Sequence, residues 1–437
     1  MASSRKSKPS LKAKTKAAKR IGLALSGGLD SVVLLDTVCK AVQKNSTQES
    51  TEVWVFHIHH GLQKPADQWL EFCEKLAKKY RVHFDFRLLH FADPSQGNIE
   101  ARARVERYEA LTDLCIEHGI EDLLLAHHQN DQAETVLLQL LRGSGVAGLS
   151  GMPFNRANTK DANTITLWRP LLNQTKAKLE AYAKEHKLKW IEDPSNQNTR
   201  YRRNAIRKEI IPRLEKIQPG AIANLARSAD LLAQSQVLLD RLAKQDGKGI
   251  IETKSLKLKP LLAFANADRP AANNLLRYWL KLNDLAMPSQ ERLESWWRDL
   301  IAVKSDSSLE WQHDEVSIYL WRGALQVAKP KVGQWVFQDV LTKGKSLGLP
   351  ADWVAQAQAE GRVEERLRQG AEKIQIKPNT PRKTLKNLFQ ESDTPPWERQ
   401  VPLLYINEQL VAVAGVGVSY PHLVPGGKRV LPCWELL

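Results

Sequence analysis

The chain has 437 residues, with 64 Lys and Arg against 49 Asp and Glu, which gives a formal net charge of +15 at pH 7. Its hydrophobic content of 42% excludes a disordered protein, and no apolar run approaches the roughly 18 residues of a membrane-spanning helix. This also predicts no membrane partner. The four cysteines form no CxxC pair, so we expect no structural zinc and a reducing, cytoplasmic compartment. At about 150 residues per domain, the length predicts about three domains.

The positive charge is unevenly distributed along the chain. Residues 1–20 hold six Lys and two Arg and no acidic residue, so this segment alone carries +8. It is poor in large apolar residues, and we expect a disordered basic arm. Both a solvated tail and an arm that binds RNA without sequence preference fit this composition.

Short β-rich runs alternate with longer helical runs in the first half of the chain. We predict strands at residues 21–25, 52–58, 82–88 and 122–126, and helices at residues 31–43, 66–80, 99–118 and 132–141. This alternation is typical of βαβ units, so residues 21–217 are expected to form a Rossmann-like α/β domain with a mostly parallel sheet.

The composition and the hydrophobic pattern of the sequence change after residue 217. Helical spacing at residues 221–244, 273–282 and 290–302 predicts a helical middle domain over residues 218–335. Basic residues, prolines and short β-like runs such as 410–418 predict a small mixed α+β domain over residues 336–437.

A glycine-rich motif, Ser26-Gly27-Gly28-Leu29-Asp30-Ser31, follows the first predicted strand. Two glycines let the backbone approach a ligand closely, and the N–H groups that open the next helix favour an anion. The two Ser hydroxyls could add phosphate contacts, and Asp30 could hold a divalent cation. A plain turn with a helix cap is the structural alternative, but the carboxyl end of a strand favours a phosphate-binding loop.

Residues 143–148 also match the letters of GxGxxG. They follow a predicted helix instead of a strand, so we interpret them as a helix end and a loop. The Walker pattern GxxxxGK[ST] is absent from the sequence, which excludes a P-loop NTPase.

Two further motifs end predicted strands of the same sheet. His59-His60-Gly61-Leu62 follows the second strand, and a run that begins at His127 follows a later one. Parallel strands bring such ends to one edge of the sheet, so these side chains should converge on the glycine-rich loop. Asp131 and Glu134 share a face of one helical turn and could bind metal or transfer protons. The alternative is a capping box with Asp131 as N-cap and Glu134 at N3.

Basic residues gather in two helical segments. Arg104 and Arg107 share one side of a predicted helix with Glu100, for which solvated ion pairs are the alternative. Residues 200–216 contain seven basic and two acidic side chains with Tyr201 among them. Arginine for phosphates beside an aromatic face favours an RNA groove, and a solvated basic helix is the alternative.

The SGGLDS loop resembles the signature of the N-type ATP pyrophosphatases, also called PP-loop enzymes. The motifs that follow it are, in order, HHGL, an NIE…AR…RY helix, AHHQNDQAET and EDPSN…YRRNAIR. Together they resemble the tRNA(Ile)-lysidine synthetase family over about residues 21–214. Residues 273–297 and 305–329 are similar to the middle substrate-binding domain of that family, and the segments from residue 382 onward are similar to its C-terminal domain.

The resemblance implies an ATP-dependent ligase. Its partners would be free L-lysine and an isoleucine tRNA with a CAU anticodon, and a homodimer is compatible with it. Lysine would be joined to C2 of the wobble cytidine through an adenylated cytidine, with release of pyrophosphate and AMP. ATP would be the co-substrate and Mg²⁺ the metal.

From the motifs and this resemblance we expect one active site. ATP would be bound by Ser26, Gly27, Gly28, Leu29, Asp30 and Ser31. Mg²⁺ would be held by Asp30 and Asp131. The catalytic residues would be Asp30, Asp131, Glu134 and His127, with Glu134 orienting or deprotonating the incoming amine. RNA or the activated intermediate would be held by His60, Arg104, Arg107, Arg203, Asn204 and Arg207.

Two other functions remain open at this point. A tRNA 2-thiolation enzyme would share the loop and the RNA surface, but that chemistry usually needs paired or cluster-binding cysteines. A non-catalytic RNA-binding protein would use the basic segments without needing the Asp and His motifs.

Overall fold

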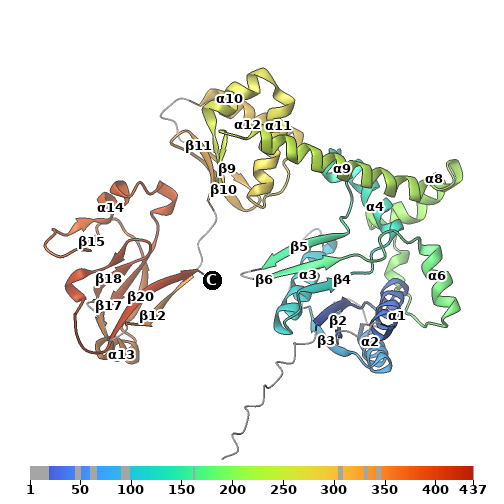
Figure 1. The fold of residues 1–437 in the computed structure, drawn as a ribbon, viewed down its shortest axis with the longest axis horizontal. Coiled ribbons are helices and arrows are strands. Elements are labelled where there is room, and N and C mark those ends of the chain that lie inside the picture. Colours follow the sequence, from blue (N-terminus) through green and yellow to red (C-terminus); the bar gives the residue numbers. More distant parts are fainter. Residues whose placement is uncertain are drawn as a thin grey trace, which may run out of the picture. The chain divides into compact units, whose positions relative to one another are not determined.

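The computed structural model describes residues 19–44, 51–59, 66–89, 99–160, 163–303, 309–328, 333–340 and 346–436. The chain forms two compact units that meet in sequence after Leu238 (Figure 1). Residues 1–18 of the basic arm and His60 lie outside the described residues. Among the helices that are described, none combines the length and the apolar composition needed to cross a membrane.

The first unit is built on a six-stranded sheet with the order β3-β2-β1-β4-β6-β5. All neighbours pair in parallel except β5, which is antiparallel to β6 at the edge. The strands are β1 (Lys19–Ala24), β2 (Thr51–His59), β3 (His83–Leu88), β4 (Asp122–Leu124), β5 (Asn155–Lys160) and β6 (Asn163–Trp168). The predicted mostly parallel sheet is confirmed, and the β5–β6 hairpin is an addition to it.

Helices cover both faces of this sheet. The helices are α1 (Leu29–Lys44), α2 (Ala66–Tyr80), α3 (Ile99–Glu117), α4 (Gln129–Leu140), α5 (Val146–Leu149) and α6 (Lys176–Glu185). Strand β2 shows why two faces are covered, because its side chains alternate. Val53 and Val55 pack in the core formed with α1, α2 and α6, whereas Phe56 and Ile58 pack in the core formed with α3.

A helical segment completes the first unit and runs into the second. It consists of a 3₁₀ turn η1 (Pro194–Gln197), α7 (Arg202–Ala205), a π-helical turn η2 (Ile206–Ile210), α8 (Ile211–Ile217) and α9 (Ala221–Asp246). The widened turn ends two residues before Pro212, which has no N–H to donate to an α-helical ladder.

The second unit begins with three further helices and an antiparallel sheet. The helices are α10 (Leu258–Ala267), α11 (Arg269–Leu282) and α12 (Gln290–Ala302), and the last two match the predicted helices. The sheet has the order β7-β8-β11-β10-β9 and was not predicted. Its strands are β7 (Ile251–Glu252), β8 (Ser255–Lys257), β9 (Leu309–His313), β10 (Val316–Trp321) and β11 (Ala324–Ala328). Trp279 and Trp296 are fully buried in the core between helices and sheet.

The last part of the second unit is mixed α+β, as predicted. Its helical elements are α13 (Ala351–Ala359), α14 (Leu385–Glu391) and the 3₁₀ turns η3 (Pro396–Glu398) and η4 (Tyr420–His422). Its strands are β12 (Gly333–Asp339), β13 (Leu349–Pro350), β14 (Val363–Leu367), β15 (Lys373–Ile374), β16 (Lys383–Thr384), β17 (Pro402–Ile406), β18 (Gln409–Val413), β19 (Gly417–Val418) and β20 (Arg429–Leu436). All strand pairs of this part are antiparallel within the described residues.

Candidate active site

The glycine-rich loop lies between the end of β1 and the start of α1, as predicted. Gly27 has φ +85°, and a Cβ atom there would come within 3.2 Å of Ile191. The Ile191 N–H donates to the Gly27 carbonyl at 2.9 Å. Ser31 Oγ donates to the Gly28 carbonyl at 2.9 Å and lies 3.1 Å from Ser26 Oγ. The loop is therefore held in shape before any ligand binds.

Two of the predicted carboxylates lie near the same nitrogen of one imidazole. His128 Nε2 lies 3.5 Å from Asp30 Oδ2 and 3.6 Å from Asp131 Oδ2. Burial alone would lower the pKa of His128, but the hydrogen bond with Asp30 and the charges of both carboxylates raise it overall. Asp30 Oδ1 is buried and has no hydrogen-bond partner among the described residues. Carboxylate oxygens suit Mg²⁺, so this unpaired oxygen of Asp30 fits such an ion.

The start of α4 differs from both readings of the sequence. His128 is the N-cap, and Asp131 at N3 completes a capping box with it. The helix thus begins three residues before the predicted start at residue 132. The capping box is formed by His128 and Asp131, three residues before the predicted pair of Asp131 and Glu134. Asp131 Oδ2 accepts from the His128 backbone N–H at 3.0 Å, while Oδ1 accepts from Arg203 at 3.1 Å. Capping and an ionic role therefore coexist in one side chain.

Glu134 is the centre of a buried ion-pair cluster. Its side chain is 0% exposed, and Arg203 Nε donates to Oε2 at 2.7 Å. Arg207 donates from Nε to Oε1 at 2.6 Å and from Nη2 to Oε2 at 3.0 Å. Both carboxylate oxygens of Glu134 therefore accept charge-assisted hydrogen bonds from guanidinium groups. Its immediate role is to hold Arg203 in α7 and Arg207 in η2 against α4.

A cavity of about 270 Å³ lies against the loop. Its apolar wall comes from Phe56, Ile58, Leu111 and Leu125, and its polar wall from Ser26, Asp30, Ser31, Arg107, Tyr108, His127 and Asp131. His127 Nδ1 has no partner among the described residues. Burial, together with the charges of Arg169, Arg104 and Arg203, lowers the pKa of His127 to about 3. His127 is therefore neutral at physiological pH.

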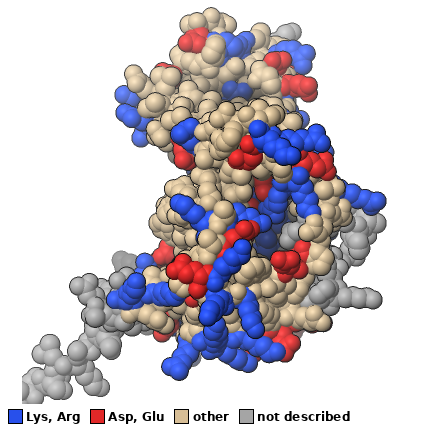
Figure 2. Space-filling model, turned by 90° about the vertical axis from the view of Figure 1, so that its right-hand side faces the viewer, with Lys and Arg blue, Asp and Glu red and all other residues tan. Residues whose placement is uncertain are grey.

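The residues that were predicted to bind RNA differ in their exposure and in their contacts. Arg107 lines the cavity, and burial lowers its pKa. Arg104 is exposed and lies 5.5 Å from the ring centre of Tyr108. Asn204 donates to the Asn198 carbonyl at 2.9 Å. Figure 2 shows the side of the first unit that carries α6 and α8, where Lys and Arg side chains gather with fewer acidic ones between them.

Two nearby residues were missed by the sequence analysis. Arg169 is 5% exposed and directly follows β6. Its position at the carboxyl end of a parallel strand is the signal that could have found it. His128 belongs to a motif that was recognised, but the hydrogen bonds that make it the N-cap depend on where α4 begins. The segment 143–148 follows α4 and includes the first three residues of α5, and none of its residues lines the cavity.

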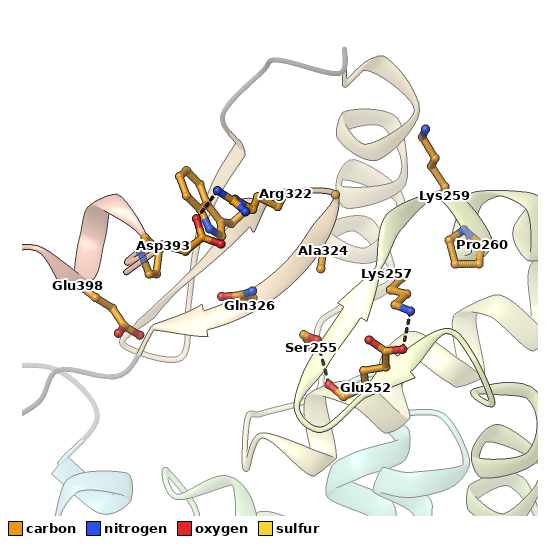
Figure 3. A pocket seen from close by; sticks show the side chains of 13 residues that line it. Glu252, Ser255, Lys257, Lys259, Pro260, Arg322, Ala324, Gln326, Asp393 and Glu398 are labelled. Atoms are coloured by element: carbon orange, nitrogen blue, oxygen red, sulfur yellow. Dashed lines mark hydrogen bonds and ion pairs between the residues drawn. The ribbon is translucent and has the colours of Figure 1, made fainter. Parts of the chain in front are cut away.

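A second, larger pocket of about 690 Å³ lies in the second unit (Figure 3). Its lining includes Lys257, which pairs with Glu252, and Arg322, which pairs with Asp393. These pairs leave little net charge to attract an anion. None of the expected site residues lies there.

The mostly parallel sheet with an SGGLDS loop after its first strand is typical of the PP-loop class, and a family model described as PP-loop domain matches residues 2–214. Models described as TilS substrate binding domain and TilS substrate C-terminal domain match residues 260–326 and 363–431. The tRNA(Ile)-lysidine synthase of Burkholderia mallei is 35% identical over 94% of this chain and 92% of its own. That of Salmonella schwarzengrund is 36% identical over 95% and 97%. The chain belongs to the tRNA(Ile)-lysidine synthase family.

Among solved structures, a U34-tRNA thiolase from Methanococcus maripaludis is similar, with 18% sequence identity and a TM-score of 0.43. The similarity covers 49% of this chain and 72% of the thiolase.

Proposed function

We propose that this protein joins free L-lysine to C2 of the wobble cytidine in the CAU anticodon of an isoleucine tRNA. In the first step the C2 carbonyl oxygen attacks the α-phosphorus of ATP, and the bond to pyrophosphate breaks. In the second step the ε-amine of lysine attacks C2, the bond from C2 to the adenylate oxygen breaks, and AMP and a proton leave. Adenylation is needed because an amide-like carbonyl oxygen is a poor leaving group.

The observation that carries this proposal is the convergence of the SGGLDS loop and Asp131 on one cavity, in a chain of this family. His128 lies near both Asp30 and Asp131. The loop is assigned to the phosphates of ATP, and the apolar wall of the cavity suits a nucleobase. Asp30 and Asp131 would hold Mg²⁺, which when bound neutralises polyphosphate charge.

The buried cluster around Glu134 supports a more limited role for that residue than general base catalysis. Both of its oxygens are taken by Arg203 and Arg207, so we assign it to orientation. The two guanidinium groups remain the candidates to hold RNA or the adenylated intermediate. Residues 21–217 would form the catalytic domain, and residues 218–335 and 336–437 would bind tRNA, in line with the two TilS models.

The alternative of tRNA 2-thiolation finds no support in the cysteines. Burial raises the pKa of Cys39 to about 11 and that of Cys73 and Cys115 to about 12. Buried thiols of this kind are chemically inert at physiological pH.

The test is one incubation of the protein with ATP, labelled lysine and the CAU-anticodon isoleucine transcript. A methionine tRNA transcript, which also has a CAU anticodon, is the control. We expect label in the isoleucine transcript alone and none with Asp30→Ala. An unlabelled isoleucine transcript, or equal labelling of the two, would contradict the proposal.

A further inference from the structure

Helix α6 and the turn that follows it carry lysines that no acidic side chain neutralises. All lysines in residues 176–189 are exposed, and none lies at ion-pair distance from a carboxylate within the described part of the chain. They are Lys176, Lys178, Lys184, Lys187 and Lys189, and we call them the α6 lysine surface. In helix α2 of the same unit, by contrast, exposed lysines are paired one helical turn away. The pairs are Lys75 with Glu71 at 2.5 Å and Lys78 with Glu74 at 2.8 Å.

The opposite face of α6 is packed, which fixes the side on which the lysines lie. Leu179 and Ala183 are buried in the core that α6 forms with α1 and α2. Tyr182 donates to Asp36 of α1 at 2.7 Å, and the Thr175 side chain caps the first turn. The α6 lysine surface therefore faces away from the core and is carried by a helix that is held in place along its length.

Both ends of this segment are hydrogen-bonded to motifs of the candidate active site. At its start, the Lys176 N–H donates to Asn130 Oδ1 at 3.1 Å, and Asn130 lies in the first turn of α4. At its end, the Ile191 N–H donates to the Gly27 carbonyl of the glycine-rich loop at 2.9 Å, two residues after Lys189. The α6 lysine surface thus begins and ends beside the residues that form the site.

The ligand that this surface favours is a polyanion. Figure 2 shows that Lys and Arg side chains gather on the side of the first unit that carries α6 and α8. Free lysine is a cation and is repelled by such a surface, and ATP is assigned to the cavity. The remaining partner is RNA, whose backbone stays at the surface when one of its bases enters the cavity. A lysine ammonium binds a phosphate as a point charge and does not read the base.

We propose that the α6 lysine surface binds backbone phosphates of the tRNA beside the nucleotide that enters the cavity. The inference rests on the proposed function and adds the surface that holds the substrate outside the reaction centre. This surface supplies affinity and does not choose between tRNAs, because all of them carry the same phosphates.

Binding of the CAU-anticodon isoleucine transcript to the full chain, measured by fluorescence anisotropy at a series of salt concentrations without ATP or lysine, tests the proposal. The double variant Lys178→Gln with Lys184→Gln should make the slope of log K against log salt shallower by about 1.5, because each lost phosphate contact accounts for about 0.7–0.9. At about 0.1 M salt, its affinity should fall about tenfold or more.

Lys75→Gln with Lys78→Gln is the matched control. It removes the same charge from exposed positions of the same unit, but these two lysines are already paired with glutamates. We expect the parental slope. Lys178→Arg with Lys184→Arg keeps both charges and should also keep the parental slope.

Two further measurements separate a backbone contact from other effects. A methionine tRNA transcript should lose as much affinity in the double Gln variant of α6 as the isoleucine transcript does, because phosphates carry no sequence information. AMP binding, measured by calorimetry, should stay within about twofold of the parent.

An unchanged slope in the double Gln variant of α6 would overturn the proposal. An equal loss in the α2 control would also overturn it, because net charge alone would then explain the effect. Loss for the isoleucine transcript alone would assign these lysines to the choice of tRNA, and weaker AMP binding would assign them to the nucleotide, so either result contradicts the proposal. Since RNA binding requires no transfer of lysine, a failed lysidine assay beside the expected slopes would count against the proposed function alone.

Discussion

The imidazole of His57, in the middle of β2, donates from Nδ1 to the carbonyl oxygen of Leu25 at 2.8 Å. His57 is 3% exposed, and burial lowers its pKa. Because a carbonyl oxygen can only accept, Nδ1 of His57 carries the proton of this bond. Leu25 is the residue before Ser26, and its own N–H donates to Phe56. From the neighbouring strand, His57 therefore holds the last peptide before the glycine-rich loop.

We expect His57→Leu to leave the Leu25 carbonyl buried and unpaired. Such a loss costs about 1–3 kcal/mol in the free energy of unfolding, and the KM for ATP should rise more than the KM for lysine. His57→Asn is the matched variant, because its amide nitrogen occupies nearly the position of Nδ1 and should restore the KM for ATP. Urea unfolding and steady-state kinetics measure the two effects. Equal changes in both KM values would show that His57 does not act on the loop.

Glu134→Gln should be one of the most damaging single substitutions in the first unit. It removes the carboxylate that pairs with Arg203 and Arg207 and leaves two partly buried cations, for which losses of about 3–5 kcal/mol are typical. We expect lower stability in urea together with loss of lysine incorporation. Glu121→Gln, an exposed change just before β4, is the control. A stable and active Glu134→Gln protein would contradict the assigned role.

Asp30→Asn and Asp131→Asn should both raise the Mg²⁺ concentration needed for half-maximal ATP binding. Each variant removes one negative charge from the pair around His128. Titration of Mg²⁺ at fixed ATP concentration measures the shift, which we expect to be about tenfold or more for loss of one charged ligand. Asp230→Asn on exposed α9 should leave the titration unchanged. An unshifted midpoint in both site variants would mean that the metal lies elsewhere.

The carboxyl group of Asp36 should make the free energy of unfolding depend on pH in the acid range. It ties three helices together, because Tyr80 of α2 and Tyr182 of α6 each donate to it at 2.7 Å and Lys40 lies 2.8 Å away. Burial alone would raise the pKa of Asp36, but these hydrogen bonds outweigh burial and lower it. A carboxyl group with a lowered pKa contributes stability above its unfolded pKa and loses it as the pH falls through the folded value.

Asp36→Asn should therefore be destabilised by about 1–3 kcal/mol at pH 7, and the difference from the parent should shrink below about pH 4. Urea unfolding at a series of pH values measures it. Glu185→Gln, an exposed change on α6, should follow the parent throughout. A difference between Asp36→Asn and the parent that stays constant down to pH 2.5 would refute the role of this carboxylate.

The local features of this protein could be read from its sequence. Strand β1, the SGGLDS turn and α1 were predictable because each follows from a short-range rule: apolar runs, glycine backbone freedom and helical period. It was also predictable that the loop, Asp131 and His127 lie near one another, since parallel strands bring their carboxyl ends to one edge of the sheet. The prediction placed the start of α4 three residues late, because which residue caps a helix depends on hydrogen bonds within one turn.

The pairings that turn these parts into a site depend on the tertiary structure alone. Glu134 and Arg203 are 69 residues apart, and Leu25 and His57 are 32 apart, so no local period relates them. The sequence placed Glu134 near the loop but left its state open, and only the folded chain shows both of its oxygens bonded to arginine. Arg169 follows the same logic, because long-range packing creates surroundings in which no described carboxylate forms an ion pair with it. Chain order thus determined which groups reach the edge of the sheet, and packing decided which of them are neutralised and which remain charged for a ligand.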